Sequence, residues 1–221
     1  MTEDIAIALS NWQSLLQPFP VDPVVSQNVF FDLATVYSSS GRFYHNLAHI
    51  QQVLQRIDGM RSRAQNSAAL EFAVWFHDVI YNPQANDNEE KSAAYAAKSL
   101  KTLGIPAEII YPVNQLILTT KNHQAPEQDI DSQILLDADL SILGASETDY
   151  GVYAQAIRQE YAWLSESDYR FGRLQVLQKF LERERIYLTG PMFAALEIKA
   201  RQNIQAEIRS LSEVNLKKIL E

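Results

Sequence analysis

The segment AALEFAVWFHDV, residues 68–79, indicates the fold class of this chain. Apolar side chains would occupy almost every side of a helix built from it, which is typical of a helix buried in the centre of a domain. The turn-forming pair Asn82–Pro83 follows closely, so the helix should end near His77 and Asp78. We therefore expect a central helix that carries a histidine and an aspartate at its C-terminal end.

The sequence on both sides of this segment also has a helical period. Apolar residues recur at Ile50, Val53, Leu54 and Ile57, which is the spacing of a half-buried helix. Further helices are expected over residues 87–104, 106–120, 130–143, 147–164, 169–183 and 191–211. No stretch has the convincing two-residue alternation of a β-strand, so the predicted class is all-α.

Two of these helices have recognisable capping residues. Asp87 and Glu90 stand three residues apart at a predicted helix start, the spacing of a capping box. Gly144 follows the helix expected over residues 130–143, in a position typical of a helix end. Internal repeats and linker-like composition are absent, so we predict a single domain over residues 1–221 with a C-terminal helical extension.

The composition excludes several kinds of protein. The 221 residues include no cysteine, which rules out disulfide bonds and thiolate metal sites. A net charge of −8 argues against a broad nucleic-acid-binding surface, because such a surface needs clustered Lys and Arg. No stretch approaches the roughly 20 apolar residues of a membrane helix. The N-terminus lacks the basic start of a secretory signal, so a cytoplasmic protein without a membrane partner is expected.

The four histidines are the main functional signal: His45, His49, His77 and His123. His45 and His49 are four residues apart and share one face if the helix begins by residue 45. Such a pair can bind one metal ion together, or one histidine can bind the metal while the other acts as an acid or base. The alternative is an ordinary capped helix start.

Acidic residues in apolar surroundings are the second signal. Asp78 next to His77 reaches the same ion only where the helix is ending, because adjacent helical residues point about 100° apart. Asp137 and Asp139 lie within the apolar segment ILLDADLSIL, and residues two apart cannot share a helix face. One of these two aspartates should therefore point inward and need a cation.

Two imidazoles and two carboxylates would form a mixed nitrogen and oxygen site for one divalent ion. Mn²⁺, Fe²⁺, Co²⁺, Ni²⁺ or Mg²⁺ suit this ligand set better than a soft metal does. Four protein ligands on a six-coordinate ion leave two positions for water and substrate, which is typical of a catalytic site.

In order and helical setting, His49, His77–Asp78 and Asp139 resemble the HD-domain superfamily of metal-dependent phosphohydrolases. The resemblance implies an HD-domain-like helical bundle with one divalent metal on these four residues. It spans about residues 10–210 and is closest to a bacterial group of predicted phosphohydrolases. Other segments that carry it are DNEEKSA (87–93), IRQEY (157–161) and GRLQVL (172–177).

Two short motifs are similar to those of cyclic-nucleotide phosphodiesterases. YHNLAH (44–49) is similar to the Y-H-N-x-x-H motif, whose first histidine is the general acid, so the resemblance gives that role to His45. Asp139 begins a D-L-S sequence similar to the one around the last metal ligand, which favours it over Asp137. Tyr81 stands where two-metal phosphodiesterases have a further histidine, so one metal ion is expected; His123 is the alternative ligand for a second.

The resemblance implies a small phosphorylated substrate, such as a nucleotide. Arg42 and Lys121 are the candidate phosphate-binding residues, because a phosphate needs cationic partners. Asp87 is a candidate water-activating acid, with the capping role as its alternative. A non-catalytic, nucleotide-sensing HD module is the alternative function, favoured by Tyr81. A di-iron oxygenase would need more histidine ligands than the chain supplies.

Overall fold

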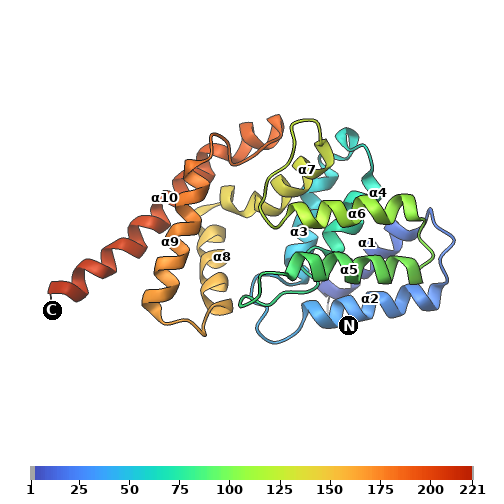
Figure 1. Ribbon diagram of the computed structural model, residues 1–221, viewed down its shortest axis with the longest axis horizontal. Helices are drawn as coiled ribbons and strands as arrows, with labels where there is room; N and C mark the ends of the chain where they lie inside the picture. Colours follow the sequence, from blue (N-terminus) through green and yellow to red (C-terminus); the bar gives the residue numbers. More distant parts are fainter. Residues whose placement is uncertain (1–2, 221) are drawn as a thin grey trace. The chain divides into compact units, whose positions relative to one another are not determined.

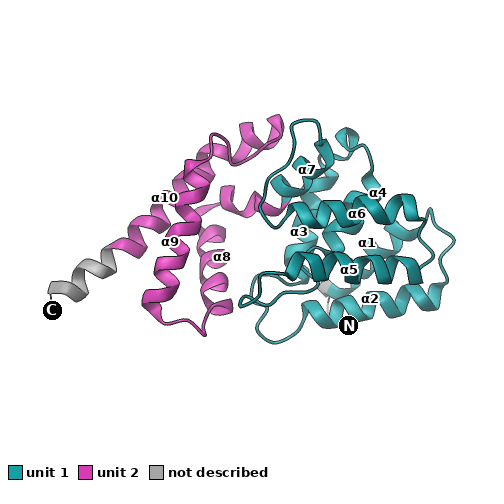
Figure 2. Ribbon diagram, in the orientation of Figure 1, with its two compact units in different colours: residues 1–138 teal, residues 139–221 magenta. Residues whose placement is uncertain are grey.

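The computed structural model describes the backbone of residues 3–220 and the side chains of residues 5–212. Within these limits every regular element is a helix, which confirms the all-α prediction (Figure 1). The chain divides into two compact units, residues 1–138 and 139–221 (Figure 2). This division does not test the expectation of a single domain with a C-terminal helical extension, which stays a prediction.

The first unit consists of α1 (Glu3–Leu16), α2 (Pro23–Tyr37), α3 (Leu47–Asp58), the 3-10 turn η1 (Arg61–Arg63), α4 (Ser67–Phe76), α5 (Asn88–Thr102), α6 (Ala107–Thr119) and α7 (Ile130–Asp139). Asp139, the last residue of α7, is also the first residue of the second unit. The second unit continues with η2 (Leu140–Gly144), α8 (Glu147–Glu160), α9 (Glu166–Glu182) and α10 (Gly190–Leu220).

Helix α4 is the centre of the first unit and packs against α1, α3, α5 and α6. All its residues from Ala69 to Phe76 are fully buried except Glu71. The indole of Trp12 on α1 meets that of Trp75 edge-on, with ring centroids 5.4 Å apart. The helix ends at Phe76, as the apolar pattern and the following turn residues predicted, and His77 and Asp78 lie in the turn that follows.

Helix α3 starts at the cap that Asn46 provides. Its Oδ1 accepts hydrogen bonds from the amides of Ala48 and His49, at 3.0 and 3.3 Å. Such a cap satisfies two of the amides that a helix start leaves without partners. Ile50, Val53 and Ile57 are buried and Leu54 is half-buried. The cap places His49 in the first turn of α3, on its buried side.

At helix α5 the sequence predicted the C-terminal end correctly but not the capping at the N-terminal end. Asp87 occupies the N-cap position but makes no capping hydrogen bond, so the predicted capping box is wrong. Its carboxylate is 2.8 Å from Nζ of Lys91 instead. At the other end Gly104 has φ +74°, and the next amide, that of Ile105, donates to the carbonyl of Leu100 at 3.0 Å. This is a Schellman ending, which requires a residue with positive φ.

The helix predicted over residues 130–143 ends earlier, at Asp139, and continues as the 3-10 turn η2. Gly144 closes that turn for a reason other than the one predicted, because its φ is not positive. A Cβ at this position would lie 2.6 Å from Cβ of Leu196 on α10. Glycine is therefore required by the close approach of another helix.

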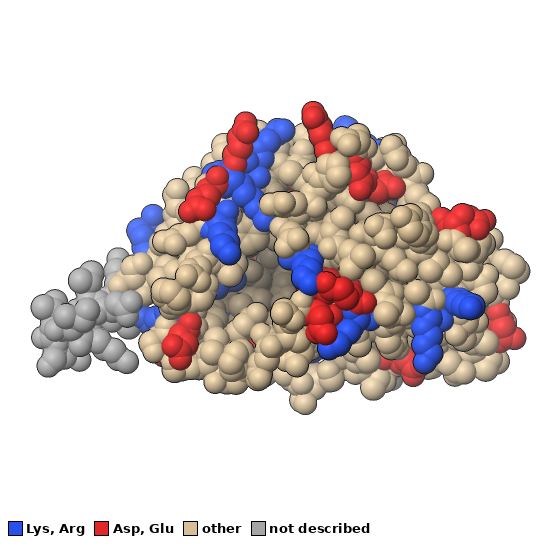
Figure 3. Space-filling view, in the orientation of Figure 1, with Lys and Arg blue, Asp and Glu red and all other residues tan. Residues whose placement is uncertain are grey.

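The remaining second-unit helices follow the predicted order: α8 ends earlier than predicted, α9 begins earlier, and α10 extends further. Ser165 caps α9 by accepting from the amide of Asp168 at 3.2 Å, which separates α8 from α9. None of the helices in the described residues is both long and apolar enough to span a membrane. On the face seen in Figure 3, basic and acidic side chains lie beside one another in several places. Arg170–Glu166 is one of the ion pairs that balance charge in this way.

Candidate metal centre

His77 is held in a defined orientation by the helix that precedes it. Its Nδ1 lies 2.9 Å from the backbone carbonyl oxygen of Val74, one turn back in α4. Because a carbonyl oxygen only accepts hydrogen bonds, Nδ1 must carry the proton. Nε2 of the neutral ring then has a lone pair. A backbone carbonyl fixes metal-binding histidines in the same way in many proteins.

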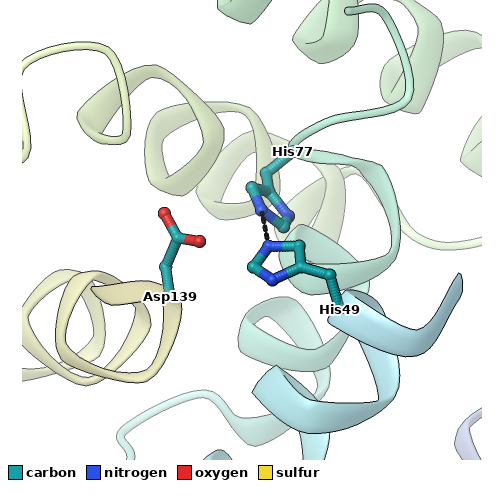
Figure 4. Close-up of side chains that lie close together, drawn as sticks. All are labelled: His49, His77 and Asp139. Atoms are coloured by element: carbon teal, nitrogen blue, oxygen red, sulfur yellow. Dashed lines mark hydrogen bonds between the residues drawn. The ribbon is translucent and has the colours of Figure 1, made fainter. Parts of the chain in front are cut away.

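His49 reaches the same point from α3. Its Nε2 lies 3.4 Å from Nε2 of His77, and Figure 4 draws this contact as a dashed line between the two rings. Both residues are 2% exposed, which places the two nitrogens away from bulk water. The capped first turn of α3 and the end of α4 thus bring together two histidines that are 28 residues apart in the sequence.

The carboxylate of Asp78 lies against both rings. Its Oδ2 is 3.1 Å from Nε2 of His77 and 3.7 Å from Nε2 of His49. The turn after α4 makes this contact feasible, because two adjacent residues in a regular helix would diverge. The side chain is 21% exposed, so this carboxylate is the more accessible part of the histidine–aspartate pair.

Asp139 supplies the other carboxylate. His49, His77 and Asp139 each offer a ligand atom, and these atoms all lie within 4.8 Å of one another. In Figure 4 the Asp139 side chain points toward the rings of His49 and His77. Asp137 is fully buried but is not part of this group. The last turn of α7 therefore brings Asp139, the aspartate that the D-L-S motif favoured, to the histidines.

The residue types of this group suit a divalent metal ion. Around an octahedral ion with bonds of about 2.1 Å, ligand atoms lie about 3.0 to 4.2 Å apart. The 3.4 Å separation of the two imidazole nitrogens is within this range. Imidazole nitrogen and carboxylate oxygen are ligands for borderline and hard divalent ions. The buried group of His49, His77 and Asp139 could thus hold a metal ion.

His45 lies at the edge of this group, in the turn before α3. Its ring is 5.9 Å from the ring of His49 and stacks at 4.2 Å, tilted by 30°, on the ring of Tyr81. Tyr44 meets the His45 ring edge-on at 5.1 Å. The side chain is half-buried. Two aromatic rings therefore limit the orientation of His45 beside the candidate ligands.

The two cations predicted to bind phosphate already have protein partners. The Arg42 guanidinium donates hydrogen bonds to the carbonyl oxygens of His45, Asp78 and Val79. Nζ of Lys121 donates to the carbonyl oxygen of Asn86, at 2.8 Å, and forms an ion pair with Glu90. Phosphate binding by these residues stays a prediction.

Asp87 and His123, the other two candidates, are not part of the ligand group. The Asp87 carboxylate is exposed, and its hydrogen bond to Lys91 lowers its pKa. His123 has φ 47° in the segment after α6, and it does not belong to the potential metal-binding group found among the described residues. The sequence carried no local signal for two sets of backbone hydrogen bonds near the site: that of His77 with the carbonyl of Val74, and those of Arg42 with the carbonyls of His45, Asp78 and Val79.

Comparisons of the chain with known protein families, with curated proteins and with solved structures each found no match. The residues of the site and the motif resemblance therefore carry the functional proposal.

Proposed function

We propose that this protein is a metal-dependent phosphohydrolase that acts on a nucleotide or another small phosphate ester. The convergence of His49, His77 and Asp139 within 4.8 Å is the observation that carries the proposal. The order of these residues and of Asp78 in the sequence, which resembles that of HD-domain phosphohydrolases, supports it further.

The charge distribution of the site favours a bound cation. In its neutral form the His77 ring has a lone pair on Nε2, which lies 3.1 Å from a carboxylate oxygen of Asp78. Two electron-pair donors at this distance repel each other unless a proton or a cation lies between them. Nε2 of His49 and the carboxylate of Asp139 add further ligands at the same place. One divalent ion, such as Mn²⁺, Fe²⁺, Co²⁺, Ni²⁺ or Mg²⁺, is the occupant that this set favours.

His49, His77, Asp78 and Asp139 would hold the ion. When bound, a divalent ion supplies a water molecule of lowered pKa and polarises a phosphoryl oxygen. Protonated His45 would donate its ring proton to the leaving-group oxygen as the phosphorus–oxygen bond breaks. The contact with Tyr81 keeps the His45 ring beside the ligands and limits its rotation away from substrate.

A nucleotide-sensing module that does not hydrolyse its ligand is the second candidate function. Tyr81 favours it, because a tyrosine stands where two-metal phosphodiesterases have a ligand histidine. The two functions differ in turnover and share the metal site.

The test is a screen of nucleoside mono-, di- and triphosphates, cyclic nucleotides and bis(p-nitrophenyl) phosphate with each of the five metals. We expect at least one substrate to be hydrolysed, and His77→Ala and Asp139→Asn to lose at least about 100-fold in kcat/KM. Asp58→Asn, at the exposed end of α3, is the matched control and should keep wild-type activity. Full turnover by His77→Ala would refute the proposal, and nucleotide binding without turnover would favour the sensing module.

A further inference from the structure

Arg42 has an unusual set of partners for an arginine near a candidate phosphate site. Its Nη1 donates to the carbonyl oxygens of His45, at 3.0 Å, and Asp78, at 2.7 Å. Its Nη2 donates to the carbonyl oxygen of Val79 at 2.9 Å. All three acceptors are backbone atoms. One belongs to His45, the proposed general acid, and one to Asp78, a proposed metal ligand.

These hydrogen bonds join two segments that lie far apart in the sequence. Asp78 and Val79 are in the turn after α4, where the chain has left the helix and carbonyl groups lose their helical partners. A guanidinium at the C-terminal end of a helix is also favoured by the helix dipole. Arg42 thereby fixes the turn after α4 to the turn before α3, and these two turns carry Asp78 and His45.

The guanidinium itself is held by aromatic rings. Its Cζ lies 5.1 Å from the ring centre of Tyr37 and 5.7 Å from that of Tyr81. Tyr37 is fully buried, and its hydroxyl donates to the carbonyl oxygen of Trp75 at 3.0 Å. A planar guanidinium can contact rings and bind several carbonyls together, whereas a lysine ammonium is a point charge on a flexible stem.

We infer that Arg42 is a positioning residue of the metal site and not a phosphate ligand. It acts through the backbone of His45 and Asp78, and so places the proposed general acid and one proposed metal ligand in the site. A substrate phosphate would have to compete with three carbonyl oxygens for the same N–H groups. The inference rests on the metal site of the proposed function, and it also changes the role that the sequence suggested for Arg42.

The two roles predict different measurements. If Arg42 bound the substrate phosphate, replacing it would raise KM and leave the affinity for the metal ion unchanged. A residue that positions the site changes metal affinity instead, and loss of such an outer partner typically costs about 10- to 100-fold. We therefore compare wild type with Arg42→Gln, Arg42→Lys and the control Arg56→Lys, an exposed arginine on α3. The affinity for Mn²⁺ alone is measured by calorimetry, KM and kcat at saturating Mn²⁺ with bis(p-nitrophenyl) phosphate, and folding by circular dichroism.

We expect Arg42→Gln to bind Mn²⁺ about 10- to 100-fold more weakly, with KM at saturating Mn²⁺ within about threefold of wild type. Arg42→Lys keeps the charge and should lose less affinity; it carries the test if Arg42→Gln does not fold. Unchanged Mn²⁺ affinity in both variants overturns the inference. A raised KM would then indicate a phosphate-binding residue, and a loss of stability alone would indicate a purely structural one. If wild type binds Mn²⁺ without turnover, the proposed function fails and the affinity comparison still decides this inference. If wild type binds no Mn²⁺, both fail.

Discussion

The buried ion pair of the second unit supports a quantitative prediction about stability. The guanidinium of Arg173 on α9 donates from Nε and Nη2 to the two carboxylate oxygens of Glu207 on α10, at 2.8 and 3.1 Å. The hydroxyl of Tyr150 on α8 donates to the same carboxylate at 2.5 Å. The two charged side chains are only 8% and 10% exposed, so water cannot replace either partner easily.

Glu207→Gln changes this arrangement without changing its size. Arg173 donates to both carboxylate oxygens, so either orientation of the amide places its NH₂ against an N–H donor. The guanidinium would also be left buried without a counter-charge. Removing one partner of a buried ion pair typically costs about 3–5 kcal/mol. We expect the free energy of unfolding to fall by about that amount.

Urea unfolding followed by far-ultraviolet circular dichroism measures this change, because all the described regular structure is helical. Glu147→Gln is the matched control. Its ion pair with Lys199 has side chains that are 85% and 34% exposed, and exposed pairs contribute about 0–1 kcal/mol. Equal free energies of unfolding for the two variants would refute the argument that burial determines the value of the Arg173–Glu207 pair.

Two further predictions concern packing and pH. Gly144→Ala should destabilise the protein by about 1–3 kcal/mol, because the new Cβ would lie 2.6 Å from Cβ of Leu196; Gly151→Ala meets no atom within 4 Å in helix α8 and should stabilise slightly. Burial raises the pKa of Glu71, although Arg61 beside it acts in the opposite direction. The folded state thus keeps this proton longer than the unfolded state, so Glu71→Gln should gain stability relative to wild type as the pH rises from about 4 to about 7, measured by urea unfolding.

Each of these two predictions has a clear contrary result. Equal stability of Gly144→Ala and Gly151→Ala would show that α10 does not approach residue 144 as closely as described. A stability difference between Glu71→Gln and wild type that is independent of pH would contradict the burial of this carboxyl group.

Local signals in the sequence predicted the helices and most of their ends. The end of α4 follows from an apolar run and the turn residues after it, and the end of α5 from Gly104. Asp87 stood at a predicted helix start, but Lys91 one turn later takes its carboxylate. A capping pattern gives only the candidates for a hydrogen bond, and a neighbouring cation can compete for them.

Interactions between distant segments were beyond the sequence patterns. Gly144 appeared to be an ordinary helix end, whereas the close approach of Leu196 on α10 explains why this position is a glycine. Arg42 was predicted to bind phosphate from its charge alone, and the carbonyl groups of Asp78 and Val79 to which it donates hydrogen bonds have no signature in sequence. Side-chain chemistry can be read from one segment; its partner on another segment cannot.

The candidate ligands were an intermediate case. His49 and His77 were identified by residue type and helical setting, and the fold places their Nε2 atoms 3.4 Å apart. The choice between Asp137 and Asp139 could not be made from helix periodicity, because both lie in an apolar segment. The D-L-S resemblance favoured Asp139, which is the aspartate found with the two histidines.

The metal content of the protein tests the central claim most directly. Purified wild-type protein, stripped with a chelator and then dialysed against Mn²⁺, is compared with Asp139→Asn and with the control Asp58→Asn by elemental analysis. We predict one tightly bound ion per chain in wild type and in Asp58→Asn, and a substoichiometric amount in Asp139→Asn. Wild-type protein without bound metal, or Asp139→Asn with a full complement, would contradict the assignment of His49, His77 and Asp139 as a metal centre.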